Sequence, residues 1–319
     1  MHEGSIYHTT EWFDFVERAL GWRIHFAVDL HEGNPRYLPF VTKLQLGRRK
    51  HICLPLSHHV GFMDAISHVP KPEIVPLKSL SNIEIHDAVE ISEVEKYCDY
   101  RSSVLDMRPF PDETALFSRL NKNSIQRKII KAQKEGVVVV DESRNPGAFK
   151  IFRDMQTDTR IRQHSLMYPP KFFEILYETF KATGWVKLYL SYKDGIPLAG
   201  IIFFHFGNVA TYAYGASHNI REISSLGANQ VAMWTAIVEA HRAGLHYVDF
   251  GVSPKGNEDL LAYKAKWGAN ETDMFYSRKG QGLRISREGR LKKHMLTLVC
   301  SLPRPLYVWV SSKIMKMLL

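Results

Sequence analysis

The chain is poor in cysteine and has no long uninterrupted apolar run. Its three cysteines, Cys53, Cys98 and Cys300, are far apart and odd in number. This spacing argues against a disulfide framework or a zinc knuckle and favours a reducing compartment. No run approaches the roughly 20 apolar residues that a transmembrane helix needs. Residues 1–4 have neither the basic start nor the apolar core of a secretory signal. We therefore expect a cytoplasmic protein.

Several signatures of catalytic chemistry are also missing. The sequence contains no Gly-x-Ser-x-Gly elbow and no phosphate loop of the Gly-x-x-x-x-Gly-Lys type. The histidines, including the adjacent His58 and His59, are not spaced with acids or cysteines as metal ligands would be. We expect no metal site, and neither serine-hydrolase nor P-loop chemistry.

Positive charge is abundant and unevenly distributed. The net charge is +9 and the sequence pI is about 9.3, which favours polyanionic partners such as nucleic acid, phosphorylated substrates or an anionic membrane surface. Two basic runs carry most of the excess. They contain Arg119, Lys122, Arg127, Lys128, Lys131 and Lys134, and then Arg278, Lys279, Arg284, Arg287, Arg290, Lys292 and Lys293.

A length of 319 residues with 45% apolar and 24% charged residues fits a globular protein of roughly two domains. Hydrophobic spacing and turn residues predict mixed α/β structure throughout. In the first third we expect a helix over 10–16 that ends before Gly21, strands over 23–30, 37–47, 50–56 and 83–86, a loop over 69–77 and a helix over 91–97.

The remaining two thirds are more regular. Asp112 is a candidate helix cap, and Asp194-Gly195 is a strong hairpin signal. We expect helices over 112–120, 121–135, 148–159, 170–183 and 226–243, a buried strand over 137–140, a three-stranded meander over 187–217 and a final strand over 247–250.

A series of motifs in this second part resembles the Fem-like transferases. These proteins are built from two halves of the GNAT acyltransferase fold, and they include enzymes that add amino acids to peptidoglycan precursors from aminoacyl-tRNA. The resemblance covers residues 105–276 and depends on the order of the motifs more than on any one of them. The motifs are 127–137 (RKIIKAQKEGV), 157–162 (TDTRIR), 169–173 (PPKFF), 195–200 (GIPLAG), 214–217 (YGAS), 227–229 (GAN), 249–251 (DFG) and 264–269 (KAKWGA).

The resemblance implies an α/β (α+β) fold of tandem GNAT-like acyltransferase domains with mixed, largely antiparallel sheets. The expected division is an N-terminal half over 1–104, a C-terminal transferase half over 105–280 and a basic amphipathic tail over 281–319.

The implied activity is transfer of an acyl or aminoacyl group to an amine of a cell-envelope, peptidoglycan-type or polysaccharide precursor. The acceptor would be phosphorylated or lipid-linked. No cofactor would be tightly bound, and the donor would be aminoacyl-tRNA or acyl-CoA. Residues 221–228 keep only the final small pair of the usual CoA-binding motif, which weakens the CoA alternative. An acyl-CoA-dependent N- or O-acetyltransferase of exopolysaccharide synthesis and a non-catalytic nucleic-acid or membrane-binding protein remain alternatives.

Lys264 is the first candidate catalytic residue. It matches the lysine of the family's aromatic-lysine motif, which is thought to stabilise the oxyanion of the tetrahedral intermediate, and its neighbour Tyr263 would contact substrate. Asp249 could orient the amine or accept its proton, and Tyr214 could face the acceptor. The alternatives are an exposed helix lysine, a carboxylate that caps or pairs with a lysine, and a packing tyrosine.

The candidate substrate-binding residues are basic or small. Arg160 and Arg162 could hold a phosphate or carboxylate, and Arg127 and Lys128 could follow the phosphates of tRNA or of a nucleotide sugar; a solvated helix surface is the alternative for both pairs. Finally, Gly227 and Ala228 begin the long helix and either allow the turn or present amides to a phosphate.

The tail has the pattern of an amphipathic helix. Its expected apolar side contains Leu306, Trp309, Val310, Ile314 and Met317, and its polar side Ser311, Ser312, Lys313 and Lys316. Such a helix could lie at the inner face of the membrane with cations toward anionic headgroups, or it could pack on the protein.

Overall fold

The computed structural model describes residues 5–45, 48–54, 56–57, 61–66, 69, 72–87, 94–218, 225–280 and 290–318. Within them the strands form one 12-stranded sheet in the order β4-β1-β2-β3-β5-β12-β6-β11-β10-β9-β8-β7. The pairs β1/β4, β3/β5 and β10/β11 are parallel, and the other neighbours are antiparallel. The sheet is thus mixed and largely antiparallel, as expected.

Within its described residues, the N-terminal part contains one α-helix, two short 3-10 helices and five strands. A short 3-10 helix, η1 (Ile6–His8), precedes α1, which begins where the Thr9 side chain accepts a hydrogen bond from Trp12 N and ends at the left-handed Gly21. The predicted helix and strands are confirmed, and a short strand occurs in the expected loop. The elements are α1 (Thr10–Leu20), β1 (Ile24–His31), β2 (Asn34–Gln45), β3 (Arg48–Cys53), β4 (Ile74–Pro76), η2 (Leu77–Ser79) and β5 (Ile83–Ile85).

The helix predicted over 91–97 is wrong for its described residues. They belong to the long strand β6 (Val94–Asp106), which pairs with β12 (Asn270–Lys279) on one side and β11 (Tyr247–Pro254) on the other. Hydrogen bonds to two strands from the far end of the chain outweigh a weak local helix preference. The expected boundary between residues 104 and 105 falls inside β6, and the division into domains stays a prediction.

The C-terminal part follows the predicted order up to β11, but the prediction that the strand over 247–250 is the final one is wrong, because α8 (Glu258–Ala265) and β12 follow it. Asp112 caps its helix by accepting a hydrogen bond from Ala115 N. The meander and the long helix are confirmed. The elements are α2 (Glu113–Arg119), the π-helical turn η3 (Lys122–Gln126), α3 (Arg127–Lys134), β7 (Val138–Asp141), α4 (Pro146–Arg162), α5 (Phe172–Phe180), β8 (Val186–Lys193), β9 (Ile196–Phe206), β10 (Val209–Ser217), α7 (Ala228–Arg242) and α8 (Glu258–Ala265).

Strand β7 differs from the prediction of a buried strand over 137–140. Among the strands that the structure describes, it is the last of the sheet and pairs with β8 alone. As a result Val138 is 60% and Val140 40% exposed, although Val137 just before it is buried. A run of four valines predicts a strand, but it does not tell whether both faces of that strand are covered.

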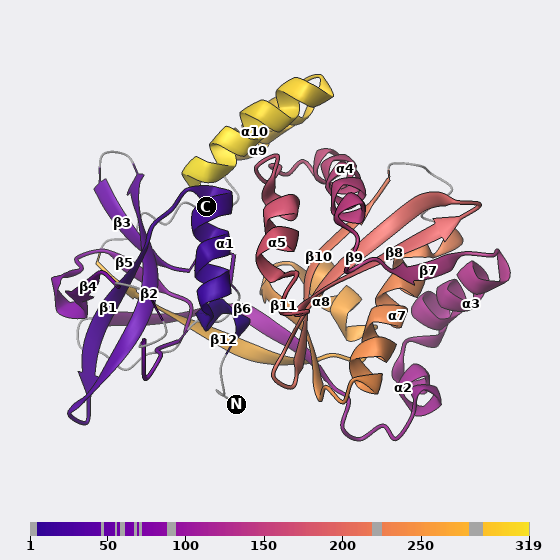
Figure 1. Ribbon diagram of the computed structural model, residues 1–319, viewed down its shortest axis with the longest axis horizontal. Coiled ribbons are helices and arrows are strands. Elements are labelled where there is room, and N and C mark those ends of the chain that lie inside the picture. The colour runs from indigo at the N-terminus through magenta and orange to yellow at the C-terminus, as the bar shows by residue number, and fades with distance from the viewer. Residues whose placement is uncertain are drawn as a thin grey trace.

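The sheet separates two hydrophobic layers in the C-terminal part. Helices α4 and α5 cover one face of β8–β10, and α3 and α7 cover the other (Figure 1). Alternation along the strands supplies both layers, since Leu188 and Leu190 face α4 and α5 while Tyr189 faces the opposite layer.

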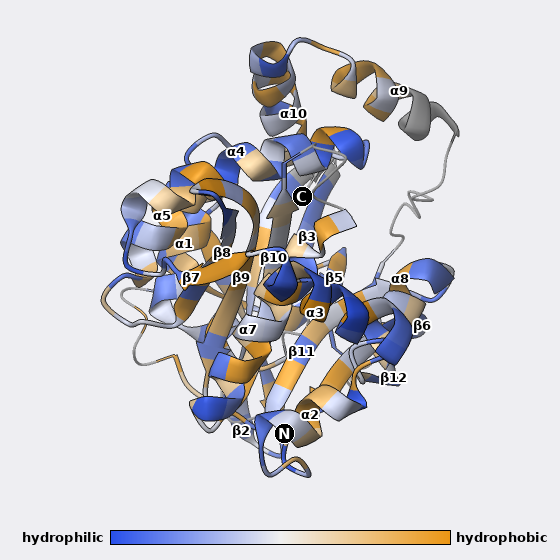
Figure 2. Cartoon of the chain, turned by 90° about the vertical axis from the view of Figure 1, so that its right-hand side faces the viewer, coloured by the Kyte–Doolittle hydropathy of each residue, from blue (hydrophilic) through white to orange (hydrophobic). Residues whose placement is uncertain are grey.

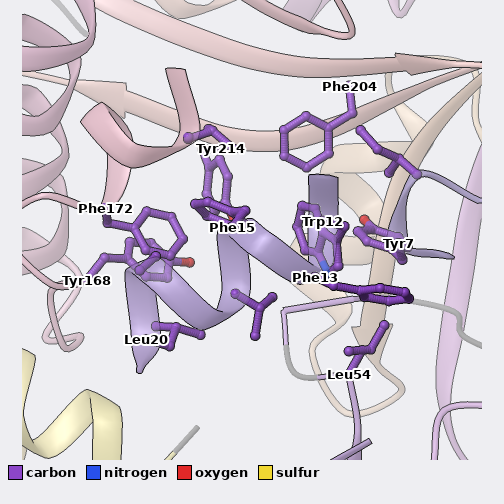
Figure 3. Close-up of a cluster of buried hydrophobic side chains, with 14 of the residues drawn as sticks. Tyr7, Trp12, Phe13, Phe15, Leu20, Leu54, Tyr168, Phe172, Phe204 and Tyr214 are labelled. Atoms are coloured by element: carbon purple, nitrogen blue, oxygen red, sulfur yellow. The ribbon is translucent and has the colours of Figure 1, made fainter. Parts of the chain in front are cut away.

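Helix α1 connects the two halves of the molecule. Its Trp12 ring lies 5.6 Å from Phe204 of β9, and its Phe15 ring lies 5.0 Å from Phe172 of α5. On its other side Phe13 packs against Phe26 of β1. Figure 3 shows these α1 side chains between residues of both halves. One hydrophobic core therefore includes residues from both ends of the sheet.

The tail forms two helices, α9 (Arg290–Cys300) and α10 (Arg304–Leu318), which lie over α1, α4 and α5 in Figure 1. Tyr307 donates to Ser165 O at 2.7 Å, and the hydroxyl of Ser311 accepts a hydrogen bond from Met167 N at 3.0 Å. Helix α10 thus packs on the protein through one face.

The face that packs is only partly the one expected from the sequence: Val310 and Ile314 of the expected apolar side do pack against the core. Ser311 and Ser312, assigned to the polar side, are buried, whereas Leu306 and Trp309 are 45% and 61% exposed. The two buried serine hydroxyls accept or donate hydrogen bonds, so their burial is not costly. Among the described helices, none combines the length and hydropathy needed to cross a bilayer.

Candidate functional site

The sheet opens between two parallel strands. β10 and β11 pair only over residues 209–211 and 247–249. Beyond these residues β10 continues to pair with β9 and β11 with β6, after a register shift between Tyr212 and Tyr214 in β10 and another between Asp249 and Val252 in β11. The carboxyl ends of the two strands therefore separate at one edge, where backbone and side chains become available to a ligand.

Lys264 of α8 lies at this separation. Its side chain is 5% exposed, and Nζ donates to the carbonyl oxygen of Gly251 in β11 at 2.7 Å. Burial lowers the pKa of Lys264 to about 8, although the charges of Asp249 and Glu271 act in the opposite direction. The alternative of an exposed helix lysine does not describe this residue.

Asp249 is held next to the same glycine. Its Oδ1 accepts a hydrogen bond from Gly251 N at 2.7 Å, and Gly251 has a positive φ of 73°. The bend at Gly251 thus presents its carbonyl to Lys264 and its amide to Asp249. Asp249 thus accepts a backbone hydrogen bond as a cap, which is one of the two roles that the sequence allowed for it.

Aromatic residues surround the end of β10. Tyr214 is 7% exposed, its ring centroid lies 5.5 Å from that of Tyr168, and burial raises its pKa. Arg160 of α4 donates to the hydroxyl of Tyr168 at 2.7 Å. Burial also raises the pKa of Tyr263. The hydroxyls of Tyr214 and Tyr263 therefore stay protonated at neutral pH and can act as hydrogen-bond donors.

Tyr7 was not identified from the sequence. Burial raises its pKa, and the negative charge of Asp249 and the neighbouring Tyr276 raise it further. A tyrosine from the short η1 helix of the N-terminal half thus lies near the carboxylate of the C-terminal half. No local motif indicates such a position, because it depends on how α1 packs between the halves.

The N-terminus of α7 lies against α3. Gly227 caps α7 with a φ of 78°, and a Cβ placed on it would lie 2.4 Å from the backbone oxygen of Lys128. Arg127 and Lys128 are exposed and form no ion pair with any other residue that the structure describes. Two free cations beside the first amides of α7, from Ala228 onward, suit an anion such as a phosphate.

Arg162 lies where β10 ends. Its Nη2 donates to the hydroxyl of Ser217 at 2.9 Å. The segment 219–224, with most of the departure from the CoA-binding motif, lies outside the described residues.

The candidate residues therefore form two neighbouring groups. Lys264, Asp249, Tyr263, Tyr214 and Arg160 belong to the elements that border the separation of β10 and β11. The second group, at the end of β10 and the start of α7, contains Arg162, Arg127, Lys128, Gly227 and Ala228. No three histidine, cysteine or acidic side chains among the described residues are grouped as metal ligands.

Comparisons with known proteins identify the domain that contains the candidate residues. Residues 119–265 match the family model described as an acetyltransferase (GNAT) domain, and this segment includes both candidate groups. No curated protein sequence matches the chain.

Solved structures match over nearly the whole length. The crystal structure of FemX is 16% identical, with a TM-score of 0.63 over 86% of this chain and 92% of that one. L-PGS from Bacillus licheniformis is 10% identical, with a TM-score of 0.56 over 95% and 100%. The C-terminal domain of a putative lysylphosphatidylglycerol synthetase from Agrobacterium fabrum is 11% identical, with a TM-score of 0.55 over 88% and 89%. The chain therefore has the fold of FemX, as its resemblance to the Fem-like transferases predicts, and contains a segment that matches the GNAT acetyltransferase domain.

Proposed function

We propose that the chain transfers an acyl or aminoacyl group to an amine of a cell-envelope, peptidoglycan-type or polysaccharide precursor. The observation that carries the proposal is the buried Lys264 at the separation of β10 and β11, inside a segment that matches an acetyltransferase domain. The fold shared with FemX and with L-PGS supports an aminoacyl donor and an envelope acceptor.

In this mechanism the acceptor amine attacks the carbonyl carbon of the donor. A carbon–nitrogen bond forms, and the ester or thioester bond to the donor breaks. The Lys264 ammonium would stabilise the oxyanion of the tetrahedral intermediate. Asp249 would take the proton that the amine loses, and this proton would pass to the leaving oxygen or sulfur. The protonated hydroxyl of Tyr214 would orient the acceptor.

The group around the start of α7 would hold the phosphates of the donor. Arg127 and Lys128 supply charge, and the amides after Gly227 supply hydrogen-bond donors. Acyl-CoA and aminoacyl-tRNA both carry phosphates, so this arrangement alone does not favour one donor. The resemblance to FemX makes aminoacyl-tRNA the first candidate.

Replacing Gly227 by alanine should weaken donor binding about tenfold or more. A left-handed backbone costs a non-glycine residue about 1–2 kcal/mol, and the new Cβ would also press on the backbone of Lys128. Isothermal titration with charged tRNA and with acetyl-CoA measures the effect. Gly244→Ala is the matched control, because Gly244 has a φ of 77° and no atom within 4 Å of its Cβ position. Gly244→Ala introduces the same backbone strain but brings the new Cβ into contact with no other residue.

The titration also separates the proposed function from its alternatives. Tight binding of acetyl-CoA, with no binding of charged tRNA, would favour an acetyltransferase of exopolysaccharide synthesis. Steeply salt-dependent binding of any RNA without transfer would favour a non-catalytic nucleic-acid-binding protein. Equal donor affinity in Gly227→Ala and Gly244→Ala would contradict the phosphate cradle at α7.

We also propose that α10 contacts the inner face of the membrane on the cytoplasmic side. Leu306, Trp309, Lys313 and Lys316 lie on one exposed side of the helix, since they follow one another at intervals of three and four residues. Exposed apolar side chains next to cations suit anionic headgroups. Figure 2 shows hydrophobic residues on both C-terminal helices, at the edge of the molecule. A lipid-linked acceptor would then be near the site.

The double variant Trp309→Ser, Leu306→Ser should reduce partitioning of the protein onto vesicles that contain anionic lipid. Each removed side chain contributes about 1.5–3 kcal/mol when it is fully buried, so a decrease of tenfold or more is expected in a flotation assay. Ile196→Ser removes an equally exposed apolar side chain on β9, far from α10, and serves as control. Unchanged flotation of the double variant would contradict membrane contact through this face.

A further inference from the structure

A polar cluster lies on the α1 side of the N-terminal half, outside the site described above. Strand register places its members on one face. Lys43 of β2 pairs with Lys50 of β3, and Arg278 of β12 pairs with Glu84 of β5. Ile52 of β3 pairs with the same Glu84, which puts all four polar side chains on a common side of the sheet, because paired residues point the same way.

We propose that this cluster is an anion-binding subsite that holds a carboxylate or phosphate group of the acceptor. Its anchoring residues are Lys43, His86 and Arg278, each of which has a buried nitrogen without a hydrogen-bond partner among the described residues. The inference rests on the proposed function only in naming the acceptor as the ligand, because anion binding itself can be measured without any transfer reaction.

Lys43 gives the strongest support. It is 9% exposed, and its Nζ lies 3.8 Å from the centroid of the Trp22 ring. The amine has no hydrogen-bond partner among the residues that the structure describes. A buried amine has up to three protons to donate, and burial without partners is costly. A bound anion would satisfy these donors.

Two further buried polar atoms of the cluster also lack a hydrogen-bond partner within the described ranges. They are Nδ1 of His86 and Nε of Arg278. Another nitrogen of each residue faces a carboxylate: His86 Nε2 lies 3.6 Å from Glu84, and Arg278 Nη2 lies 2.5 Å from Glu95. Each side chain is thus fixed in orientation and keeps one nitrogen for another partner.

Positive charge exceeds negative charge in the cluster. The cations Lys43, Lys50 and Arg278 face two carboxylates, Glu84 and Glu95. Lys50 lies 2.9 Å from Glu84, so that pair is internally compensated. Of the three cations, Lys43 is the one that forms no ion pair with a carboxylate within the described part of the chain.

The pKa values of Lys43 and Glu84 agree with the excess of positive charge in the cluster. Burial lowers the pKa of Lys43 to about 7; the charge of Lys50 adds to the effect and that of Glu84 opposes it. For Glu84, burial acts to raise the pKa, but hydrogen bonds from His86 and Lys50 outweigh it and lower the pKa to about 2. Glu84 is therefore charged and already paired, and it leaves Lys43 uncompensated.

The cluster is connected to the transfer site by aromatic residues. The ring of His86 stacks on Tyr276 at 4.8 Å. Tyr7 interacts electrostatically with both Tyr276 and Asp249, and Asp249 and Lys264 meet at Gly251. A ligand anchored by its anionic group at Lys43 could thus extend along Tyr276 and Tyr7 to place an amine near Asp249.

The test is titration of the full chain with sulfate, a doubly charged anion that does not change protonation near neutral pH. At low ionic strength and about pH 6, where Lys43 is charged, Lys43→Met should weaken sulfate binding about tenfold or more. Methionine keeps the length of the side chain, and removal of a buried uncompensated amine should not unfold the protein. Lys78→Met removes an exposed lysine from the same half and controls for net charge and for sulfate bound elsewhere.

Fluorescence provides a second measurement. The emission of Trp22, taken as the difference between wild type and Trp22→Phe, should respond to sulfate because the Lys43 amine lies over its ring. Competition by inorganic phosphate and by acetate then identifies the group: a stronger effect of phosphate indicates a phosphoryl acceptor, and a stronger effect of acetate indicates a carboxylate.

Equal sulfate affinity in Lys43→Met and in wild type would overturn the subsite. This outcome is distinct from failure of the proposed function. If no donor were ever consumed but Lys43→Met still lost sulfate binding, the anion subsite would stand and the transferase assignment would fall.

Discussion

Replacing Lys264 by methionine should lower the kcat of acyl transfer by about 10²–10³-fold, a loss typical of removing one oxyanion-stabilising donor. The amine of Lys264 is buried and fixed by the carbonyl of Gly251. A charge in such a site needs no reorganisation when the oxyanion forms. The measurement is single-turnover transfer from the donor identified by titration.

Lys266→Met is the matched control, because Lys266 lies two residues further along the chain and is exposed. It removes the same charge from the same region and should keep transfer within about twofold, as expected for a surface substitution. Loss of the Lys264 hydrogen bond leaves the Gly251 carbonyl without that partner, which should cost no more than about 1–3 kcal/mol of stability. Full activity of a folded Lys264→Met protein would refute the assignment of this residue.

The pH profile provides an independent check of the same residue. Because burial lowers the pKa of Lys264 to about 8, its positive charge is present below about pH 8 and is lost as pH rises through that value. An acceptor amine alone would react faster at higher pH, so a fall in rate above about pH 8 is diagnostic of a required cation. This falling limb should be absent in Lys264→Met.

The free energy of unfolding should change with pH in the direction opposite to the rate. Between about pH 8 and 10.5, the ordinary pKa of a lysine side chain, the unfolded chain keeps the proton that folded Lys264 has lost. The unfolded state then binds more protons, so the free energy of unfolding rises with pH across that window. The methionine variant should lack this rise.

Replacing Trp12 by alanine should lower the free energy of unfolding by about 3–5 kcal/mol, the usual cost of deleting a large buried aromatic side chain. Trp12 is 0% exposed. Its ring lies 4.8 Å from Tyr7, 5.3 Å from Phe15 and 5.6 Å from Phe204, which places it between the two halves (Figure 3). Urea denaturation followed by circular dichroism gives the free energy.

Phe275→Ala is the control for Trp12. Phe275 is 45% exposed on β12, and its removal should change stability by no more than about 0.5 kcal/mol. Because Trp12 also contacts Tyr7, the alanine variant should disturb the surroundings of Asp249 as well as stability. If Trp12→Ala were no less stable than Phe275→Ala, α1 would not be the connection between the halves that the packing indicates.

Local sequence signals predicted the second half of the fold well. The Asp194-Gly195 turn sets the β8/β9 hairpin, and the spacing of Ile125, Ile129 and Ala132 gives the buried side of the helical segment that they share. These features depend on neighbours within a few residues. Pairing of β6 with β12 depends instead on residues about 170 positions apart, such as Arg101 and Glu271, and no local pattern contains that information.

In the candidate site, too, some residues could be identified from the sequence and others only from tertiary contacts. Lys264 and Asp249 were selected through a family resemblance, and the structure brings them to a common glycine. Their burial could not be derived from composition or periodicity. Tyr7 and Lys43 could not be identified from the sequence. The role of Tyr7 depends on its tertiary neighbour Asp249, and that of Lys43 depends on Trp22.

The shared strands β6 and β12 have a consequence for substrate selection. Strand β6 pairs with β12 on one side and β11 on the other, so a hinge motion that separates the two halves would have to break these backbone hydrogen bonds. If Lys43 anchors the acceptor as proposed, strand geometry fixes the distance between this anchor and Lys264. Acceptors would be sorted by the length between their anionic group and their amine, before any chemical feature of either end is tested.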